Sequence, residues 1–232
     1  MFKHKKHLFF DLDHTLWDFE HNAKECLQEI YETENLHHLG ADFEKFFDTF
    51  SIINKQMWSS LEKSEISHED IRRFRFQKSA AAIGAEMSEE DSLACNEHLL
   101  RLLPHKTKLI DGSLEVLDAL KGKYELHILS NGYQEVQQKK IASSKITDYF
   151  THIVTNDEAG ARKPDKAIFE YALSKAMSPA SAAIMIGDSY EADIKGAKGA
   201  GIESIFFDQH DTPGTSSYTH KITKLTELLT LF

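Results

Sequence analysis

Apolar residues along the chain follow two different patterns, which divide the sequence into two kinds of structure. Between about residues 20 and 103, apolar residues recur at the three- and four-residue spacing of helices, most clearly from Phe43 to Leu61. From about residue 107, short apolar runs alternate with helical stretches, which is typical of a parallel sheet covered by helices. The runs expected to form strands are residues 7–10, 124–129, 152–154, 182–186 and 204–207.

The helical segment separates the strand at residues 7–10 from the other strands, so we interpret it as an insertion into one sheet domain. The fold class expected is α/β, a doubly wound, Rossmann-like parallel sheet with an inserted four-helix cap domain. We expect the core at residues 1–16 and 107–232 and the helical cap at residues 17–106. Residues 209–217 are predicted to form a polar, exposed loop.

Composition and charge narrow the functional classes. The formal net charge of −10 argues against binding of nucleic acid polymers, although a local pocket can still hold a small phosphorylated molecule. No segment is apolar for long enough to cross a membrane, and the run at residues 8–10 is too short for a signal peptide. Cys26 and Cys95 form no metal or redox motif, so we expect buried thiols in a cytoplasmic protein.

The first predicted strand runs straight into two carboxylates, Asp11 and Asp13. A carboxylate at the end of a buried strand is costly unless a metal ion, a cation or hydrogen bonds compensate it. The chain must also bend here if both acids serve one site, because side chains two residues apart do not converge on one point along an extended strand. This pair is the strongest indication of function in the sequence.

Polar residues also follow the other predicted strands, at the edge where ligands collect in open α/β sheets. They are Ser130-Asn131-Gly132 after the second strand, Arg162 to Asp165 after the third, and Gly187-Asp188-Ser189 with Asp193 after the fourth. Each group alone is an ordinary turn, but four such groups in one sheet are difficult to explain as turns. Phosphoryl transfer requires these residue types: carboxylates for Mg²⁺ and for attack on phosphorus, and a hydroxyl and a lysine for the phosphoryl oxygens.

Four segments resemble the motifs of the haloacid dehalogenase-like hydrolases, and the helical insertion resembles the helical cap of that superfamily. The segments are Phe10–Leu16, Leu129–Gly132, Lys163–Pro164 and Gly187–Ser189 with Asp193. Together they are highly specific, and the resemblance covers essentially the whole chain. It therefore implies a fold, an activity and a role for individual residues.

The resemblance implies that Asp11 is the nucleophile and a metal ligand. Asp13 would be the general acid and base, with its backbone carbonyl on the metal. Asp188 would complete the Mg²⁺ site, and Asp193 would support this site from behind the ligands. The residues that would hold the phosphoryl group are Ser130, Asn131 and Lys163.

Two positions near the first motif bear on the substrate. An acid at Asp13 favours phosphatase or phosphomutase chemistry, since the dehalogenases proper lack a carboxylate there. His14 stands where the common pattern has glycine, and the string from Asp11 to Phe19 resembles the bacterial pyrimidine 5′-nucleotidase subgroup. His14, Trp17 and Tyr133 are possible substrate contacts, and the alternative for Trp17 is packing at the hinge of the cap.

We therefore expect an Mg²⁺-dependent phosphomonoester hydrolase that acts through an aspartyl-phosphate on a nucleoside 5′-monophosphate, in particular a pyrimidine one. Alternatives are a phosphatase for a sugar phosphate or small organic phosphate, similar to phosphoglycolate phosphatases, and a phosphomutase. A non-catalytic binding or regulatory protein on the same fold is the alternative from another class. The expected partner is a small phosphorylated metabolite, not a nucleic acid polymer or a membrane, and we expect a monomer or a homodimer.

Overall fold

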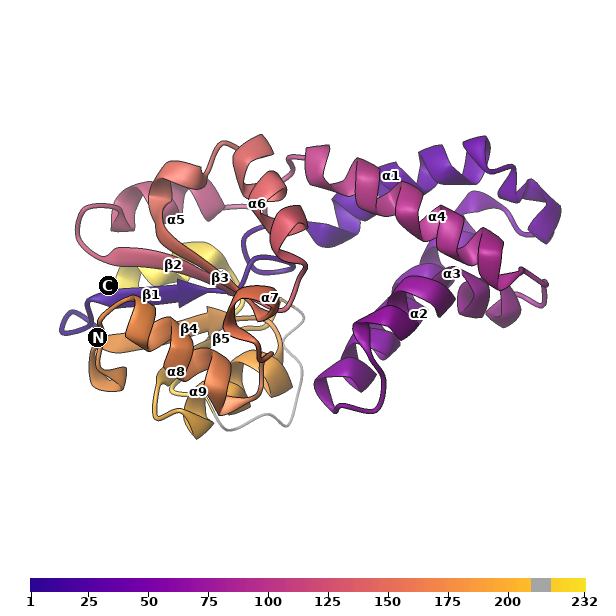
Figure 1. Ribbon diagram of the computed structural model, residues 1–232. Coiled ribbons are helices and arrows are strands. Elements are labelled where there is room, and N and C mark those ends of the chain that lie inside the picture. The colour runs from indigo at the N-terminus through magenta and orange to yellow at the C-terminus, as the bar shows by residue number, and fades with distance from the viewer. Residues whose placement is uncertain (210–217) are drawn as a thin grey trace. The chain divides into compact units, whose positions relative to one another are not determined.

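Figure 1 shows the computed structural model of the chain, which describes residues 1–209 and 218–232. The chain forms two compact units, one comprising Met1–Phe19 and Thr107–Phe232 and the other Glu20–Lys106. The predicted loop at 209–217 lies outside the described residues, apart from Gln209. Across the described part of the chain, no helix combines the length and apolar character needed to span a lipid bilayer.

The first unit contains a parallel sheet of six strands in the order β3-β2-β1-β4-β5-β6. The strands are β1 (His7–Phe10), β2 (Glu125–Ser130), β3 (Phe150–Thr155), β4 (Ala183–Gly187), β5 (Glu203–Phe207) and β6 (His220–Ile222). The strand order reverses between β1 and β4, which confirms the predicted doubly wound fold class. The sixth strand was not predicted, because three residues without an apolar run carry too little pattern.

Helices cover both faces of the sheet (Figure 1). On one face lie α5 (Ser113–Leu120) and α6 (Gln134–Ser143), and on the other lie α8 (Lys166–Lys175) and α9 (Gly196–Gly199). The shorter helical segments of this unit are η3 (Thr147–Tyr149), α7 (Asn156–Ala159), η4 (Ala180–Ala182), the π-helix η5 (Tyr190–Lys195), η6 (Leu225–Glu227) and α10 (Leu228–Leu231).

The central strands are fixed by burial on both faces. Every residue of β1 and of β4 is buried, as expected for a parallel sheet between two helical layers. On one face Phe9 and Met185 share a core with Phe169 and Ala172 of α8. Each large apolar side chain buried in this way contributes about 1.5–3 kcal/mol. The carboxyl ends of β1 and β4 are therefore held firmly, and these ends carry the candidate site.

The second unit contains four α-helices, as the sequence predicted. They are α1 (Phe19–Thr33, beginning in the first unit), α2 (Phe43–Glu62), α3 (His68–Ala82) and α4 (Glu89–Leu102), with the short segments η1 (Leu36–Leu39) and η2 (Leu103–His105). Phe46 and Phe50 of α2 pack on Phe76 of α3, with ring centroids 6.3 and 5.0 Å apart. Cys26 and Cys95 are buried thiols, as predicted. The role of this unit as a cap stays a prediction.

Candidate active site

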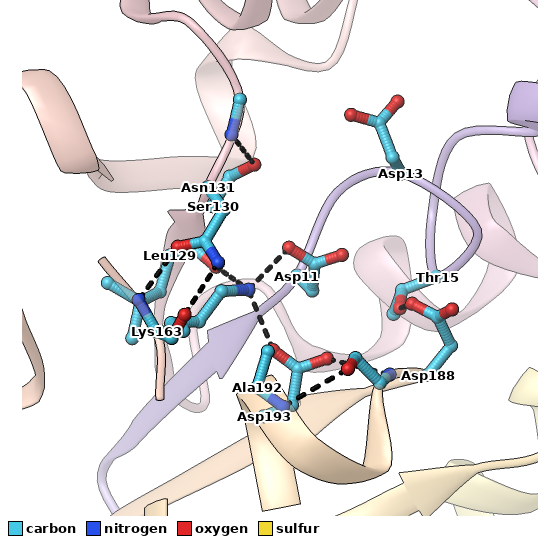
Figure 2. Close-up of polar contacts among 12 residues, drawn as sticks. Asp11, Asp13, Thr15, Leu129, Ser130, Asn131, Lys163, Asp188, Ala192 and Asp193 are labelled. Carbon is cyan, nitrogen blue, oxygen red and sulfur yellow. Dashed lines mark hydrogen bonds and ion pairs between the residues drawn. The ribbon is translucent and has the colours of Figure 1, made fainter. Parts of the chain in front are cut away.

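Side chains from separate segments meet at the carboxyl ends of β1 and β4 (Figure 2). Asp11 directly follows β1, Asp188 directly follows β4, Asp193 lies in the π-helix η5, and Lys163 comes from the loop after α7. Carboxylate oxygens of the three acids lie within 4.8 Å of one another. The structure therefore brings together four residues that the sequence placed after three different strands.

Lys163 is the cation of this cluster. Its Nζ donates hydrogen bonds to Asp11 Oδ1, to Asp193 Oδ1 and to the carbonyl oxygen of Leu129, each 2.7 Å long. The side chain is only 3% exposed, so these bonds are shielded from water and strong. The amide of Asn131 holds the backbone of Lys163, donating to its carbonyl oxygen and accepting from its N–H, both at 2.8 Å. A contact between Asn131 and a phosphoryl group stays a prediction.

The acids of the cluster hold protons more tightly than usual. Burial raises the pKa of Asp11 to about 7, against the opposing charge of Lys163. Burial likewise raises the pKa of Asp188 to about 6 and shifts that of Asp193 upward. Burial alone would lower the pKa of Lys163, but the charges of Asp11 and Asp193 raise it above its ordinary value. Three carboxylates, of which Asp11 and Asp193 are buried and Asp188 is partly buried, therefore face one ammonium group, and negative charge is in excess.

This excess fits a divalent cation. Carboxylate oxygens are the ligands that Mg²⁺ prefers, and few of them are needed because the ion keeps several waters. Asp188 is oriented by Thr15, whose Oγ1 donates to Asp188 Oδ1 at 3.1 Å. In Asp193, Oδ1 accepts from Lys163 and Oδ2 from the N–H of Ser189 at 3.0 Å. Both oxygens of Asp193 are thus engaged, which favours a supporting role and leaves Asp11 and Asp188 as the candidate ligands.

Asp13 faces another direction. Its side chain points away from the cluster around Asp11 (Figure 2). Lys140 Nζ donates to Asp13 Oδ1 and Gln137 Nε2 donates to Asp13 Oδ2, both at 2.7 Å. Burial alone would raise the pKa of Asp13, but the charge of Lys140 and the hydrogen bonds from Lys140 and Gln137 hold it below its usual value.

The sequence reasoning missed Gln137 and Lys140. One signal could have found them. Gln137 lies four residues before Ile141 and Lys140 directly precedes it, and all three are on the buried side of α6. Polar side chains at core-facing positions of a helix are uncommon and need partners. The partner of both is Asp13, and Gln137 also donates to Ser130 Oγ at 2.7 Å.

The possible substrate contacts lie close to the bend after β1. His14 has φ 59°, in the left-handed region that favours glycine, so the chain keeps this backbone conformation with histidine in place of glycine. The ring of His14 lies 5.1 Å from that of Phe19. Trp17 is fully buried, and Tyr133 precedes the first residue of α6. Substrate contacts of these residues stay predictions.

The fold and the site define a doubly wound α/β protein with a carboxylate–lysine cluster at its switch point. The chain belongs to the haloacid dehalogenase-like hydrolases, because the model of that family matches residues 8–207. This membership confirms the resemblance of the four motifs.

Relatives extend over nearly the whole chain. The pyrimidine 5′-nucleotidase YjjG of Escherichia coli K12 is 28% identical over 224 residues, covering 95% of each protein. The pyrimidine 5′-nucleotidase PynA of Streptococcus pneumoniae is 30% identical over 208 residues, covering 88% of this chain and 84% of PynA. The ribulose-1,5-bisphosphate 5-phosphatase of Halopiger xanaduensis is 28% identical over 206 residues, covering 87% and 84%. Each of these three relatives is thus named for the hydrolysis of a phosphate ester.

A solved structure agrees with the fold. The magnesium-bound HAD-hydrolase YfnB of Bacillus subtilis superimposes with a TM-score of 0.89, at 26% identity and with 98% of both chains covered. Membership, relatives and fold together support a phosphatase of this superfamily.

Proposed function

We propose that the protein is an Mg²⁺-dependent phosphomonoester hydrolase in which Asp11 is the nucleophile. The observation that carries the proposal is the position of Asp11, which combines an ion pair with Lys163 and a place in the cluster with Asp188 and Asp193. A nucleophile, a cation for the phosphoryl oxygens and candidate metal ligands thus converge on one point. The separate Asp13 supplies an acid that does not compete for the same cation.

In the first step a carboxylate oxygen of Asp11 attacks phosphorus, and the bond from phosphorus to the ester oxygen breaks. Asp13, which must first take up a proton from solvent because its ion pair with Lys140 favours the carboxylate, gives that proton to the leaving oxygen, so an alcohol departs and an aspartyl-phosphate remains. Lys163 and the hydroxyl of Ser130 stabilise charge on the nonbridging oxygens. Mg²⁺ held by Asp11, Asp188 and the backbone carbonyl of Asp13 would neutralise further charge on the phosphoryl group.

In the second step Asp13, now a carboxylate, takes a proton from water while the water oxygen attacks phosphorus. The acyl phosphate bond breaks, inorganic phosphate leaves, and Asp11 returns to a carboxylate. Asp13 has regained its proton, so the cycle closes. This division of labour explains why two acids two residues apart have different neighbours.

The substrate proposed is a nucleoside 5′-monophosphate, in particular a pyrimidine one. Two relatives that span most of the chain have this activity, and the segment from Asp11 to Phe19 resembles that subgroup. A phosphorylated sugar is the second candidate, favoured by the ribulose-1,5-bisphosphate 5-phosphatase relative. Two buried cysteines that remain thiols fit a reducing compartment, and we propose the cytoplasm.

Release of inorganic phosphate with and without Mg²⁺ tests the proposed chemistry. We expect hydrolysis that needs the metal and falls at least about 10³-fold in Asp11→Asn, since loss of a nucleophile costs several orders of magnitude. Asp148→Asn, which changes an exposed acid of η3, is the matched control and should keep full activity. Hydrolysis that survives Asp11→Asn, or that is absent in the unaltered protein, contradicts the proposal.

The substrate has a separate test. Pyrimidine and purine 5′-monophosphates and phosphorylated sugars are compared by kcat/KM at one saturating Mg²⁺ concentration. Pyrimidine nucleotides should be the best substrates. Phosphorylated sugars that exceed every nucleotide would contradict the nucleotidase proposal while leaving the phosphatase chemistry intact.

A further inference from the structure

We propose that Lys140 and Gln137 of α6 are positioning residues that hold Asp13 apart from Asp11, at the side of the leaving group. The inference rests on the proposed function and adds two residues that lie outside the four motifs. Lys140 and Gln137 bind one oxygen each of the Asp13 carboxylate. Two bonds from residues one helical turn apart fix both the place of the carboxylate and the rotation of its plane.

The geometry of phosphoryl transfer makes this separation useful. Attacking and leaving oxygens lie roughly in line on opposite sides of phosphorus. An acid that protonates the leaving oxygen must therefore stand away from the nucleophile, with room for the phosphoryl group between them. Asp13 points away from Asp11 in the structure (Figure 2), and the contacts with Lys140 and Gln137 account for that direction.

Lys140 is built into the protein rather than extended into water. Its side chain is only 3% exposed, whereas a lysine on a helix usually reaches solvent. Its Nζ lies 4.4 Å from the ring centroid of Trp17 and 5.7 Å from that of Phe19. The two aromatic rings stabilise the charge on the sides that the carboxylate of Asp13 leaves open. A buried ammonium paired with Asp13 in this way serves to place that acid.

Gln137 extends the arrangement to Ser130. The two hydrogens of its amide nitrogen go to Asp13 Oδ2 and to Ser130 Oγ, both at 2.7 Å. Ser130 Oγ also accepts from the N–H of Gly132 at 3.2 Å. A hydroxyl oxygen has two acceptor sites, so both are used and the hydroxyl hydrogen of Ser130 is directed to another acceptor, the phosphoryl oxygen of the proposed reaction.

Gly132 makes this contact possible. A Cβ atom at position 132 would overlap the side-chain amide of Gln137. The glycine of the second motif thus leaves the space through which Gln137 reaches both Ser130 and Asp13. One amide nitrogen thereby links Asp13, the proposed acid, to Ser130, whose hydroxyl is proposed to donate a hydrogen bond to the phosphoryl group.

The dependence on the leaving group tests this role. Lys140→Met removes the charge and keeps the length of the side chain, and kcat/KM is measured for a nucleoside 5′-monophosphate and for p-nitrophenyl phosphate at saturating Mg²⁺. General acid catalysis contributes roughly 10²–10⁴-fold, and it matters most for the poor alkoxide leaving group. We expect a loss of about tenfold or more with the nucleotide and of less than about threefold with the aryl ester. Asp13→Asn should show the same selectivity in a stronger form.

Two further variants separate position from general damage. Lys140→Arg keeps a cation and should recover most of the nucleotide activity. Lys139→Met changes the exposed neighbour, whose partner is Glu135 one helical turn away, and should leave both substrates unaffected. Gln137→Met should repeat the selectivity of Lys140→Met. Because it changes no charge, it replaces Lys140→Met in the test if near-UV circular dichroism shows that Lys140→Met does not fold.

The failures are distinguishable. An unaltered protein without phosphatase activity, or one indifferent to Asp11→Asn, overturns the proposed function and the inference with it. An active, Asp11-dependent enzyme in which Lys140→Met and Gln137→Met change both substrates equally, or change neither, overturns the inference alone.

Discussion

Two buried lysines, Lys163 and Lys140, divide the acids of the candidate site between them. Lys163 compensates Asp11 and Asp193, and Lys140 compensates Asp13. A carboxylate that shared one cation with its neighbour would change its protonation whenever the neighbour did. Because Lys140 belongs to Asp13 alone of these three acids, Asp13 can exchange a proton without changing the ion pair of Asp11 with Lys163, as the proposed two-step phosphoryl transfer requires.

A single glycine at the end of β4 makes the pairing of Asp193 possible. A Cβ atom at Gly187 would overlap Asp193 Oδ2, whereas one at Gly199 in α9 would have no atom within 4 Å. We expect Gly187→Ala to lower the free energy of unfolding by about 1–3 kcal/mol, the usual cost of overpacking, and to reduce hydrolysis because Lys163 loses its geometry.

Gly199→Ala is the matched control. It should leave the stability unchanged or raise it by up to about 1 kcal/mol, as replacement of glycine in a helix commonly does. Urea unfolding followed by circular dichroism measures both variants. Equal stability of Gly187→Ala and Gly199→Ala would contradict the steric argument.

Three neighbouring strands place a row of imidazoles across the sheet. His7 of β1, His127 of β2 and His152 of β3 lie side by side, with ring centroids 5.5 and 5.3 Å apart. His127 is fully buried. Burial, and then the charges of His152 and His7, lower the pKa of His127 to about 3.

This row predicts a contribution to acid unfolding. In the unfolded chain His127 takes a proton near its ordinary pKa of about 6.5, but in the folded protein it does so only near pH 3. The contribution of His127 to the free energy of unfolding is therefore fully present above about pH 6.5. It is lost as the pH falls from there toward 3, by up to about 1.4 kcal/mol per pH unit.

Replacement of the imidazole tests this element. His127→Phe keeps a flat ring against Phe9, whose centroid lies 4.7 Å away, and should flatten the decline in unfolding free energy between pH 6 and 4. His4→Gln, at a side chain that is 65% exposed, should leave the decline as it is. Parallel pH profiles of His127→Phe and the unaltered protein would exclude the row as a source of acid sensitivity.

The elements that sequence could predict are those with a clear pattern. The strands before Asp11, Ser130 and Asp188 were found because apolar runs end there in polar residues, and the fold class followed from their alternation with helices. β6 was missed because His220–Ile222 is short. α6 is one of the helices that alternate with the strands, as expected, but its functional face was not foreseen, since Lys140 looks like any solvated helix lysine until the fold places Asp13 beside it.

At the scale of the whole molecule, metal binding and stability are linked through the raised pKa values of Asp11 and Asp188. Without metal, the folded state keeps protons on these groups up to about pH 7 and 6, whereas the unfolded chain releases them near pH 4. The two groups therefore favour the folded state at low pH, and this contribution is lost progressively as the pH rises from about 4 to about 7. Mg²⁺ needs the carboxylates deprotonated, so its stabilising effect should grow over the same range.

Thermal unfolding with and without Mg²⁺ measures this linkage. At a concentration of about 100 times Kd, a ligand adds roughly 2.7 kcal/mol, which corresponds to a rise in Tm of about 5–10 °C for a chain of this size. We expect that rise at pH 8 and a much smaller one at pH 5.5. Asp188→Asn should reduce the rise at pH 8, and an equal rise at both pH values would contradict the assignment of these acids as ligands.

The position of β1 has a consequence for biosynthesis. β1 is made first yet lies in the middle of the sheet, and its neighbour β4 begins more than 170 residues later. At about 5–20 residues per second, a ribosome needs roughly 10–30 s to supply that neighbour. The helical unit Glu20–Lys106 is complete long before then and can fold while translation continues. Asp11, the proposed nucleophile, can reach its buried ion pair only when Lys163 and β4 have left the ribosome.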